Sequence, residues 1–98
     1  MSDDLFQLAS TVVDEASFIA FIEALRDDRH ADVEAERKAP SSPFGASARG
    51  WENGSVGQFL DAAVAWGHAT ANGTSQYFVP QNPWRRAAQI ICAGKFYE

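Results

Sequence analysis

Large apolar residues at helical spacing, each run preceded by a helix-starting residue, constrain this fold more than any other feature. The first clear run has the i, i+3, i+4, i+7 pattern of one helix face: Phe18, Phe21, Ile22 and Leu25. Asp14 precedes this run and is of a type favoured at the N-cap, where its carboxylate can accept a backbone N–H. We therefore expect an amphipathic helix that starts at Asp14.

Two further helices are predicted in the second half of the chain. Ser55 and Gln58 match a capping box, and an apolar series at helical spacing accompanies them: Val56, Phe59, Leu60, Ala63 and Trp66. Asn82 followed by Pro83 is a typical start for a last helix, because proline at the first position loses no hydrogen bond. Its apolar stripe is Trp84, Ala87, Ala88 and Ile91. Gly94 stands where a helix commonly ends.

The predicted fold class is all-α. We expect residues 1–98 to form one compact domain of three main helices, with a short N-terminal helix and a flexible proline-rich loop at about 39–50. Phe44 is the expected anchor of that loop on the core. From 26 to 38 the apolar stripe fades among charged residues, so the sequence leaves open whether the helix continues in solvent or frays.

Charge is distributed unevenly along the chain. The formal net charge is −5, and residues 1–39 hold ten acids against four bases. This balance excludes a basic nucleic-acid footprint and favours, if anything, a basic protein partner. The predicted partner-binding residues are the acids after Leu25 with the loop phenylalanine: Asp27, Asp28, Asp32, Glu34, Glu36 and Phe44. The alternative is that these acids only solubilise a helix face. We call these five acids the acidic band.

Two clusters outside the acidic band could contact a partner. The triplet Trp51-Glu52-Asn53 is a possible binding hot spot, because tryptophan is enriched among such residues. Its alternative is structural, with Trp51 in the core and Asn53 satisfying loop amides or capping the next helix. Arg85 and Arg86 oppose the dipole at a helix start, so they should pair with carboxylates of the acidic half or Glu98, or else with an acidic partner.

No arrangement of residues predicts catalysis, a metal site or a cofactor. His30 and His68 are far apart and lack second ligands at metal-binding spacing. Cys92 lies among apolar residues and is expected to be a buried structural thiol rather than a nucleophile. There is no signal-peptide pattern and no apolar stretch of membrane-spanning length, so the expected location is the cytoplasm.

The chain resembles a family of small bacterial proteins, a domain of unknown function. Several motifs of that family occur between residues 13 and 98: Ser17-Phe18-Ile19-Ala20-Phe21, Trp51-Glu52-Asn53, Phe59-Leu60-Asp61-Ala62, Trp66, Trp84 and Tyr97-Glu98. The resemblance implies a compact single domain and implies no activity. The proline-rich segment 40–47 departs from the family pattern.

The functional expectation is therefore a non-enzymatic, acidic protein that binds another protein. Its most specific form is a bacterial immunity or inhibitor protein that occludes a basic partner such as a toxin or effector. One alternative is a structural or homo-oligomeric helical module. A second is an enzyme whose carboxylates are brought together only by the fold. Neither direct nucleic-acid binding nor membrane association is expected.

Overall fold

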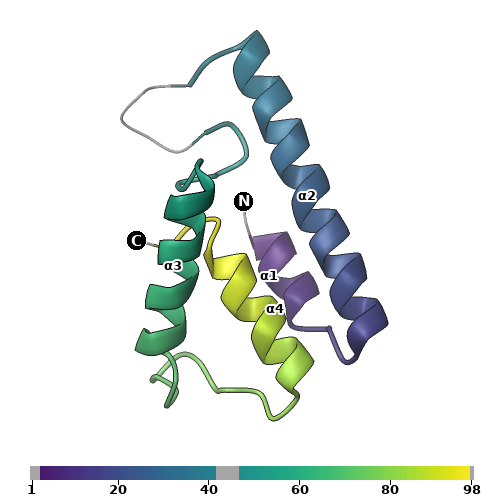
Figure 1. Ribbon diagram of the computed structural model, residues 1–98, viewed down its shortest axis with the longest axis vertical. Helices are drawn as coiled ribbons and strands as arrows, with labels where there is room; N and C mark the ends of the chain where they lie inside the picture. Colours follow the sequence, from purple (N-terminus) through teal and green to yellow (C-terminus); the bar gives the residue numbers. More distant parts are fainter. Residues whose placement is uncertain (1–2, 42–46, 98) are drawn as a thin grey trace.

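The computed structural model describes residues 3–41 and 47–97, and four α-helices make up its regular structure (Figure 1). They are α1 (Asp3–Ala9), α2 (Glu15–Lys38), α3 (Val56–Ala69) and α4 (Pro83–Ala93). The all-α prediction is confirmed, including the short N-terminal helix. Phe44, the expected loop anchor, lies outside the described residues.

Each main helix begins where its capping residue predicts. The Asp14 carboxylate accepts a hydrogen bond from Ser17 N at 2.9 Å, and Ser17 Oγ accepts one from Asp14 N at 3.1 Å. Ser55 Oγ likewise accepts from Gln58 N at 3.1 Å. The Asn82 side chain accepts from the first free amides of α4. These caps satisfy N–H groups that a helix start leaves without partners, so the starting points are fixed locally.

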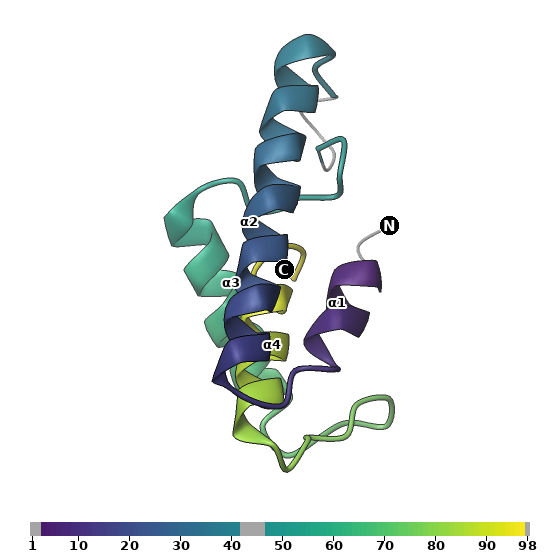
Figure 2. The ribbon, with the colours of Figure 1, turned by 90° about the vertical axis from the view of Figure 1, so that its right-hand side faces the viewer.

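The open question about residues 26–38 is resolved in favour of a continuous helix. α2 runs unbroken to Lys38, and its C-terminal half extends beyond the other helices (Figures 1 and 2). Apolar packing does not hold this half in place, since Val33 is 50% exposed. Acidic side chains of this half instead accept hydrogen bonds from the described residues between α2 and α3, which return along the helix and which we call the connecting segment.

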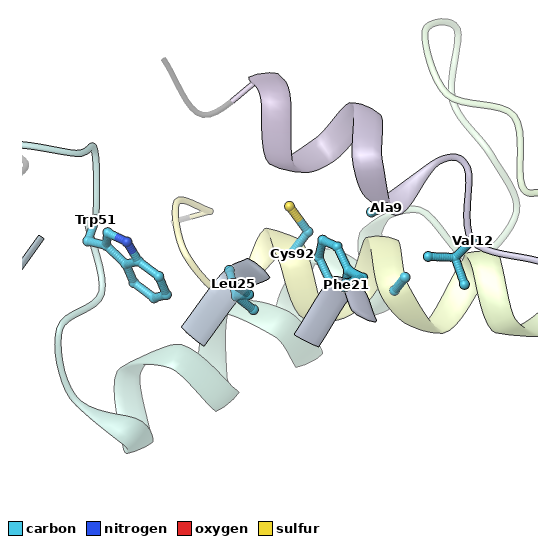
Figure 3. Close-up of a cluster of buried hydrophobic side chains, with 7 residues drawn as sticks. Ala9, Val12, Phe21, Leu25, Trp51 and Cys92 are labelled. Atoms are coloured by element: carbon cyan, nitrogen blue, oxygen red, sulfur yellow. The ribbon is translucent and has the colours of Figure 1, made fainter. Parts of the chain in front are cut away.

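α4 is the central helix and contacts each of the other three. Seen from the side of α2, α1 and α3 lie on opposite sides of α4 (Figures 2 and 3). The buried cluster lies where these helices meet, and it consists of Ala9, Val12, Phe21, Leu25, Trp51, Ala88 and Cys92. Phe21 is 1% exposed and is the largest fully buried side chain among the described residues.

Gly94, directly after α4, allows α3 to approach closely. A Cβ atom at this position would lie 2.8 Å from Cε1 of Phe59, well inside van der Waals contact. The backbone there is helical, with φ of −56°, so the glycine is needed for space rather than for an unusual turn. The expected helix-ending role of Gly94 is therefore joined by a packing role.

Three residues of the predicted apolar stripes do not belong to the core. Val56 and Leu60 of α3 are 77% and 55% exposed, and Trp84 of α4 is 38% exposed. Trp84 contacts the Phe18 ring at a centroid distance of 5.5 Å. Helical spacing shows which apolar residues share one face of a helix, but not whether another element covers that face. Among the described elements, none covers the flank of α3 that carries Leu60.

We expect Phe21→Ala to lower the free energy of unfolding by about 3–5 kcal/mol, because it removes a fully buried ring and leaves a cavity. Leu60→Ala is the control and should change stability by about 0.5 kcal/mol or less, since the side chain is mostly in solvent. Urea denaturation measures both. Equal losses from the two variants would contradict this core.

Candidate functional site

Asp28 is the centre of a network that joins three distant parts of the chain. Its Oδ2 accepts from Lys95 Nζ and from Trp51 Nε1, each at 2.8 Å, and its Oδ1 accepts from Arg49 Nε at 2.8 Å. Lys95 is only 1% exposed. A buried ammonium needs a close counter-charge, so Asp28 fixes α2, the connecting segment and the residues after α4 to one another.

Charged partners and burial act in opposite directions on the pKa of Asp28. Burial, the largest single influence, raises that pKa, but hydrogen bonds from Lys95, Arg49 and Trp51 together outweigh it. The net pKa lies below the ordinary value of 3.8. Asp28 is therefore an ionised structural group at neutral pH rather than a proton donor.

Asp32 continues the same row of α2, four residues after Asp28. It is fully buried. Its Oδ1 accepts from Ser47 Oγ at 2.7 Å and from Arg49 N at 2.8 Å, while Oδ2 pairs with Arg29 Nη1 at 2.8 Å. The carboxylate thus satisfies the backbone of the connecting segment and leaves no surface for a partner.

Glu36 is the third acid of this row, at i+8 from Asp28. It accepts backbone N–H groups from Ser41 at 2.8 Å and from Ala48 at 2.6 Å. Hydrogen bonds from the Ser41 hydroxyl and amide lower the pKa of Glu36 below its ordinary value. We call Asp28, Asp32 and Glu36 the acid row; it binds the chain's own connecting segment.

The predicted acidic band is therefore divided in two. Only Asp27 and Glu34 of its five acids are exposed, and both have cationic neighbours: Arg26 for Asp27, and Arg37 and Lys38 for Glu34. The expectation of one exposed acidic surface is corrected, because the acid row faces the returning segment. Whether Asp27 and Glu34 bind a partner stays a prediction.

The triplet Trp51-Glu52-Asn53 is brought together with residues 94–97. Trp51 is 7% exposed, and the Asn53 side chain donates to the carbonyl oxygens of Gly94 (3.1 Å) and Tyr97 (3.0 Å). Glu52 is exposed, and its backbone N–H donates to Lys95 O at 2.9 Å. The structural alternative for Trp51 is confirmed, while Asn53 satisfies carbonyl groups rather than capping α3.

Arg85 and Arg86 do not pair with the acidic half of the chain. Arg85 Nε donates to Val12 O at 3.1 Å, and Arg86 donates to Gly67 O and to the Thr70 hydroxyl at 2.9 Å each. Among the described residues their partners are thus carbonyl and hydroxyl oxygens rather than carboxylates. Glu98, the other expected partner, lies outside the described residues.

An apolar groove opens between α2 and α3. It encloses about 370 Å³ and is lined mainly by Ile22, Leu25, Trp51, Val56, Phe59 and Ile91, with Arg26 and Arg29 on the α2 side. Trp51 and Phe59 stack in its wall, with ring centroids 6.1 Å apart. The acid row positions this wall, because Asp28 holds the Trp51 indole. Trp51 is thus a core residue with one side on a groove.

Exposed apolar residues continue from the groove along α3. Val56 is 77% exposed, Leu60 is 55% exposed and Val64 is 58% exposed, and they follow one another at i, i+4 and i+8. We call these three residues the α3 stripe. The sequence contained their signal, because apolar residues cover more of α3 than one neighbouring helix needs. The predicted apolar series of this helix included Val56 and Leu60 but not Val64.

The described residues offer no arrangement of groups suited to catalysis on a metal or by a thiolate. Among them, no group of three or more His, Cys, Asp or Glu residues could hold a metal ion. Burial raises the pKa of the Cys92 thiol to about 12, and the side chain is fully inaccessible. Cys92 is a neutral core residue.

Residues 14–98 match a family of unknown function, DUF7660, and the chain belongs to that family. The match confirms a family of unknown function, while the bacterial origin and the motifs ascribed to that family stay predictions. No curated protein and no solved structure matches the chain. Within residues 3–41 and 47–97, no helix combines the length and the apolar character that crossing a membrane requires.

We expect Asp28→Asn to lower stability at neutral pH by about 3–5 kcal/mol, because Lys95 would remain buried without a counter-charge. Asp27→Asn, at the exposed neighbour, is the control and should change stability by about 0.5 kcal/mol or less. The pKa of Asp28 is lowered in the folded state. Its contribution is therefore complete above 3.8 and is lost as pH falls through the folded-state pKa.

Urea denaturation of both variants across this pH range tests the network. The difference in free energy of unfolding between wild type and Asp28→Asn should become smaller as the pH falls. The corresponding difference for Asp27→Asn should stay small throughout. A small Asp28→Asn effect at neutral pH would contradict the structural role of the ion pair.

We expect Cys92 to react slowly with a chromogenic thiol reagent in the native protein at mildly alkaline pH, and rapidly in denaturant. The reason is its complete burial together with a pKa raised to about 12. Stopped-flow absorbance measures both rates. Native labelling as fast as that of the denatured chain would show an accessible thiolate.

Proposed function

We propose that this protein is a non-enzymatic protein-binding domain, and that it contacts its partner through the groove between α2 and α3 and the adjoining α3 stripe. The exposure of Val56, Leu60 and Val64 on one flank of one helix is the observation that carries the proposal. Contiguous exposed apolar surface beside a groove is typical of interaction sites, because its desolvation favours association.

A helix of another protein is the partner segment that best fits this surface. The groove runs between two helices and offers apolar side chains on both walls, as helix-in-groove sites do. Arg26 and Arg29 also line the α2 wall, but they already pair with Asp27 and Asp32, so the apolar side chains determine the fit. The partner helix should therefore carry apolar anchors at i, i+4 and i+7.

The more specific hypothesis of an immunity or inhibitor protein that occludes a basic partner receives less support. Asp28, Asp32 and Glu36 bind the chain's own segments, and the exposed Asp27 and Glu34 have cations beside them. We propose an apolar contact in its place. An occluding role in the cytoplasm remains compatible with such a contact.

Affinity capture from the native host, followed by binding of the purified partner, tests the proposal. Leu60→Asp should weaken binding by about tenfold or more, because it places a charge in a desolvated contact. Val33→Asp is the matched control, since Val33 is 50% exposed on the distant part of α2. It should bind like wild type, and both variants should keep the wild-type melting temperature.

Salt and self-association distinguish the remaining alternatives. An apolar contact should weaken little as ionic strength rises, whereas a contact through Asp27 and Glu34 should weaken strongly. Sedimentation of the protein alone should give a monomer. Self-association that Leu60→Asp abolishes would favour the homo-oligomeric module, and equal effects of Leu60→Asp and Val33→Asp would refute this binding surface.

A further inference from the structure

A cavity separate from the groove between α2 and α3 lies on another side of α3. It opens between α1, α3, the segment after α3 and the residues that follow α4, and it encloses about 730 Å³. This volume falls within the range of about 300–1,000 Å³ that is usual for small-molecule sites. Its walls carry rings from four separate parts of the chain: Phe6, Trp66, Tyr77, Phe96 and Tyr97.

Trp66 is the fixed centre of these rings. Its indole meets the Phe6 ring edge-on, with centroids 6.2 Å apart, and the Tyr77 ring at 5.0 Å. Edge-to-face contacts of this kind stabilise ring orientation as well as burial. The aromatic wall is therefore organised by contacts between α1, α3 and the segment that carries Tyr77.

Arg86 of α4 fixes two of these rings from outside the cavity lining. Its guanidinium carbon lies 5.3 Å from the Trp66 centroid and 5.7 Å from the Tyr77 centroid. Its nitrogens donate to Gly67 O, the Thr70 hydroxyl and the Tyr77 hydroxyl. The Arg86 guanidinium thus places a permanent positive charge against the Trp66 and Tyr77 rings, as in a cation–π contact.

A hydrogen-bonded chain holds the irregular segment in place. The Tyr77 hydroxyl donates to the side-chain oxygen Oε1 of Gln89, and Gln89 Nε2 donates to Ser10 Oγ at 3.1 Å. Gln89 is 6% exposed. Tyr77 is thus connected to α4 and, through Gln89, to the end of α1, so the wall is ordered although no helix carries it.

We propose that this cavity binds a flat aromatic small molecule that is neutral or carries one negative charge. Rings on several sides favour stacking of a planar ligand, and the amides of Gln7 and Gln76 with the Thr74 hydroxyl can bind its polar edge. Every described lining residue is uncharged. Arg86, directly behind Trp66 and Tyr77, should repel a cationic ligand.

Three probes with one ring system and different charges test this assignment: indole, indole-3-acetate and tryptamine. Titration of the full chain, followed by NMR, should give saturable shifts of the Trp66 indole N–H for the first two. Tryptamine should bind roughly fivefold more weakly or worse. The Trp51 indole signal should stay unchanged, because that ring lies at the other groove.

Two matched variants locate the binding. Ala69 is exposed on α3 and lines the cavity, so Ala69→Phe should fill it and abolish the shifts. Ala65→Phe makes the same change one turn earlier, outside the lining, and should bind like wild type. Absence of saturation, tryptamine binding equal to or tighter than indole, or equal effects of the two variants would overturn the proposal. It is independent of the protein-binding proposal, which uses other residues.

Discussion

The ion pair between Asp28 and Lys95 is the interaction on which the rest of this structure depends. It joins α2 to the residues after α4, and the same carboxylate holds Trp51 and Arg49 of the connecting segment. Removing either charge would leave the other buried, which is far more costly than never having buried the pair. This makes the pair a strong determinant of position: the two groups must meet, so the segments that carry them are fixed relative to each other. The same constraint positions Trp51 and therefore the wall of the groove between α2 and α3.

Two faces of this protein depart from the usual rule that charged side chains lie outside and apolar ones inside, although the core itself is apolar. The acid row on α2 faces inward, where backbone N–H groups and cations satisfy it. Meanwhile the α3 stripe and part of Trp84 face solvent. The polar groups of the connecting segment need hydrogen-bond partners where they are buried, so the acids that accept from them meet a structural requirement. Exposed apolar residues at regular spacing meet no such requirement within the described part of this chain, which is why we assign them to a partner rather than to stability.

The start of each main helix and the all-α class were predictable from the sequence, because capping depends on residues only three positions apart, as with Asp14 and Ser17. The role of the acid row was not predictable. Asp28 meets Lys95 across 67 residues and Trp51 across 23, and charge counts alone do not show which way a carboxylate points. The exposure of the α3 stripe was missed for a related reason: helical spacing placed Leu60 on an apolar flank, but only the packing of α3 against α4 shows that this flank has no neighbour in the described structure. Trp51 and Asn53 were singled out as a possible hot spot, which stays a prediction, and their structural roles depend on the residues after α4.

The closing contacts all involve residues 94–97, and this has a consequence for how the protein is made. Asn53 binds the carbonyl oxygens of Gly94 and Tyr97, Glu52 N–H binds that of Lys95, and Phe59 packs where Gly94 leaves space. Synthesis proceeds from the N-terminus, so α2, the connecting segment and α3 are made before any of these partners exists. Until residue 95 has been added, the Asp28 carboxylate lacks the Lys95 ammonium that pairs with it. The contacts that close this end of the fold can therefore form only after the turn behind α4 has been made.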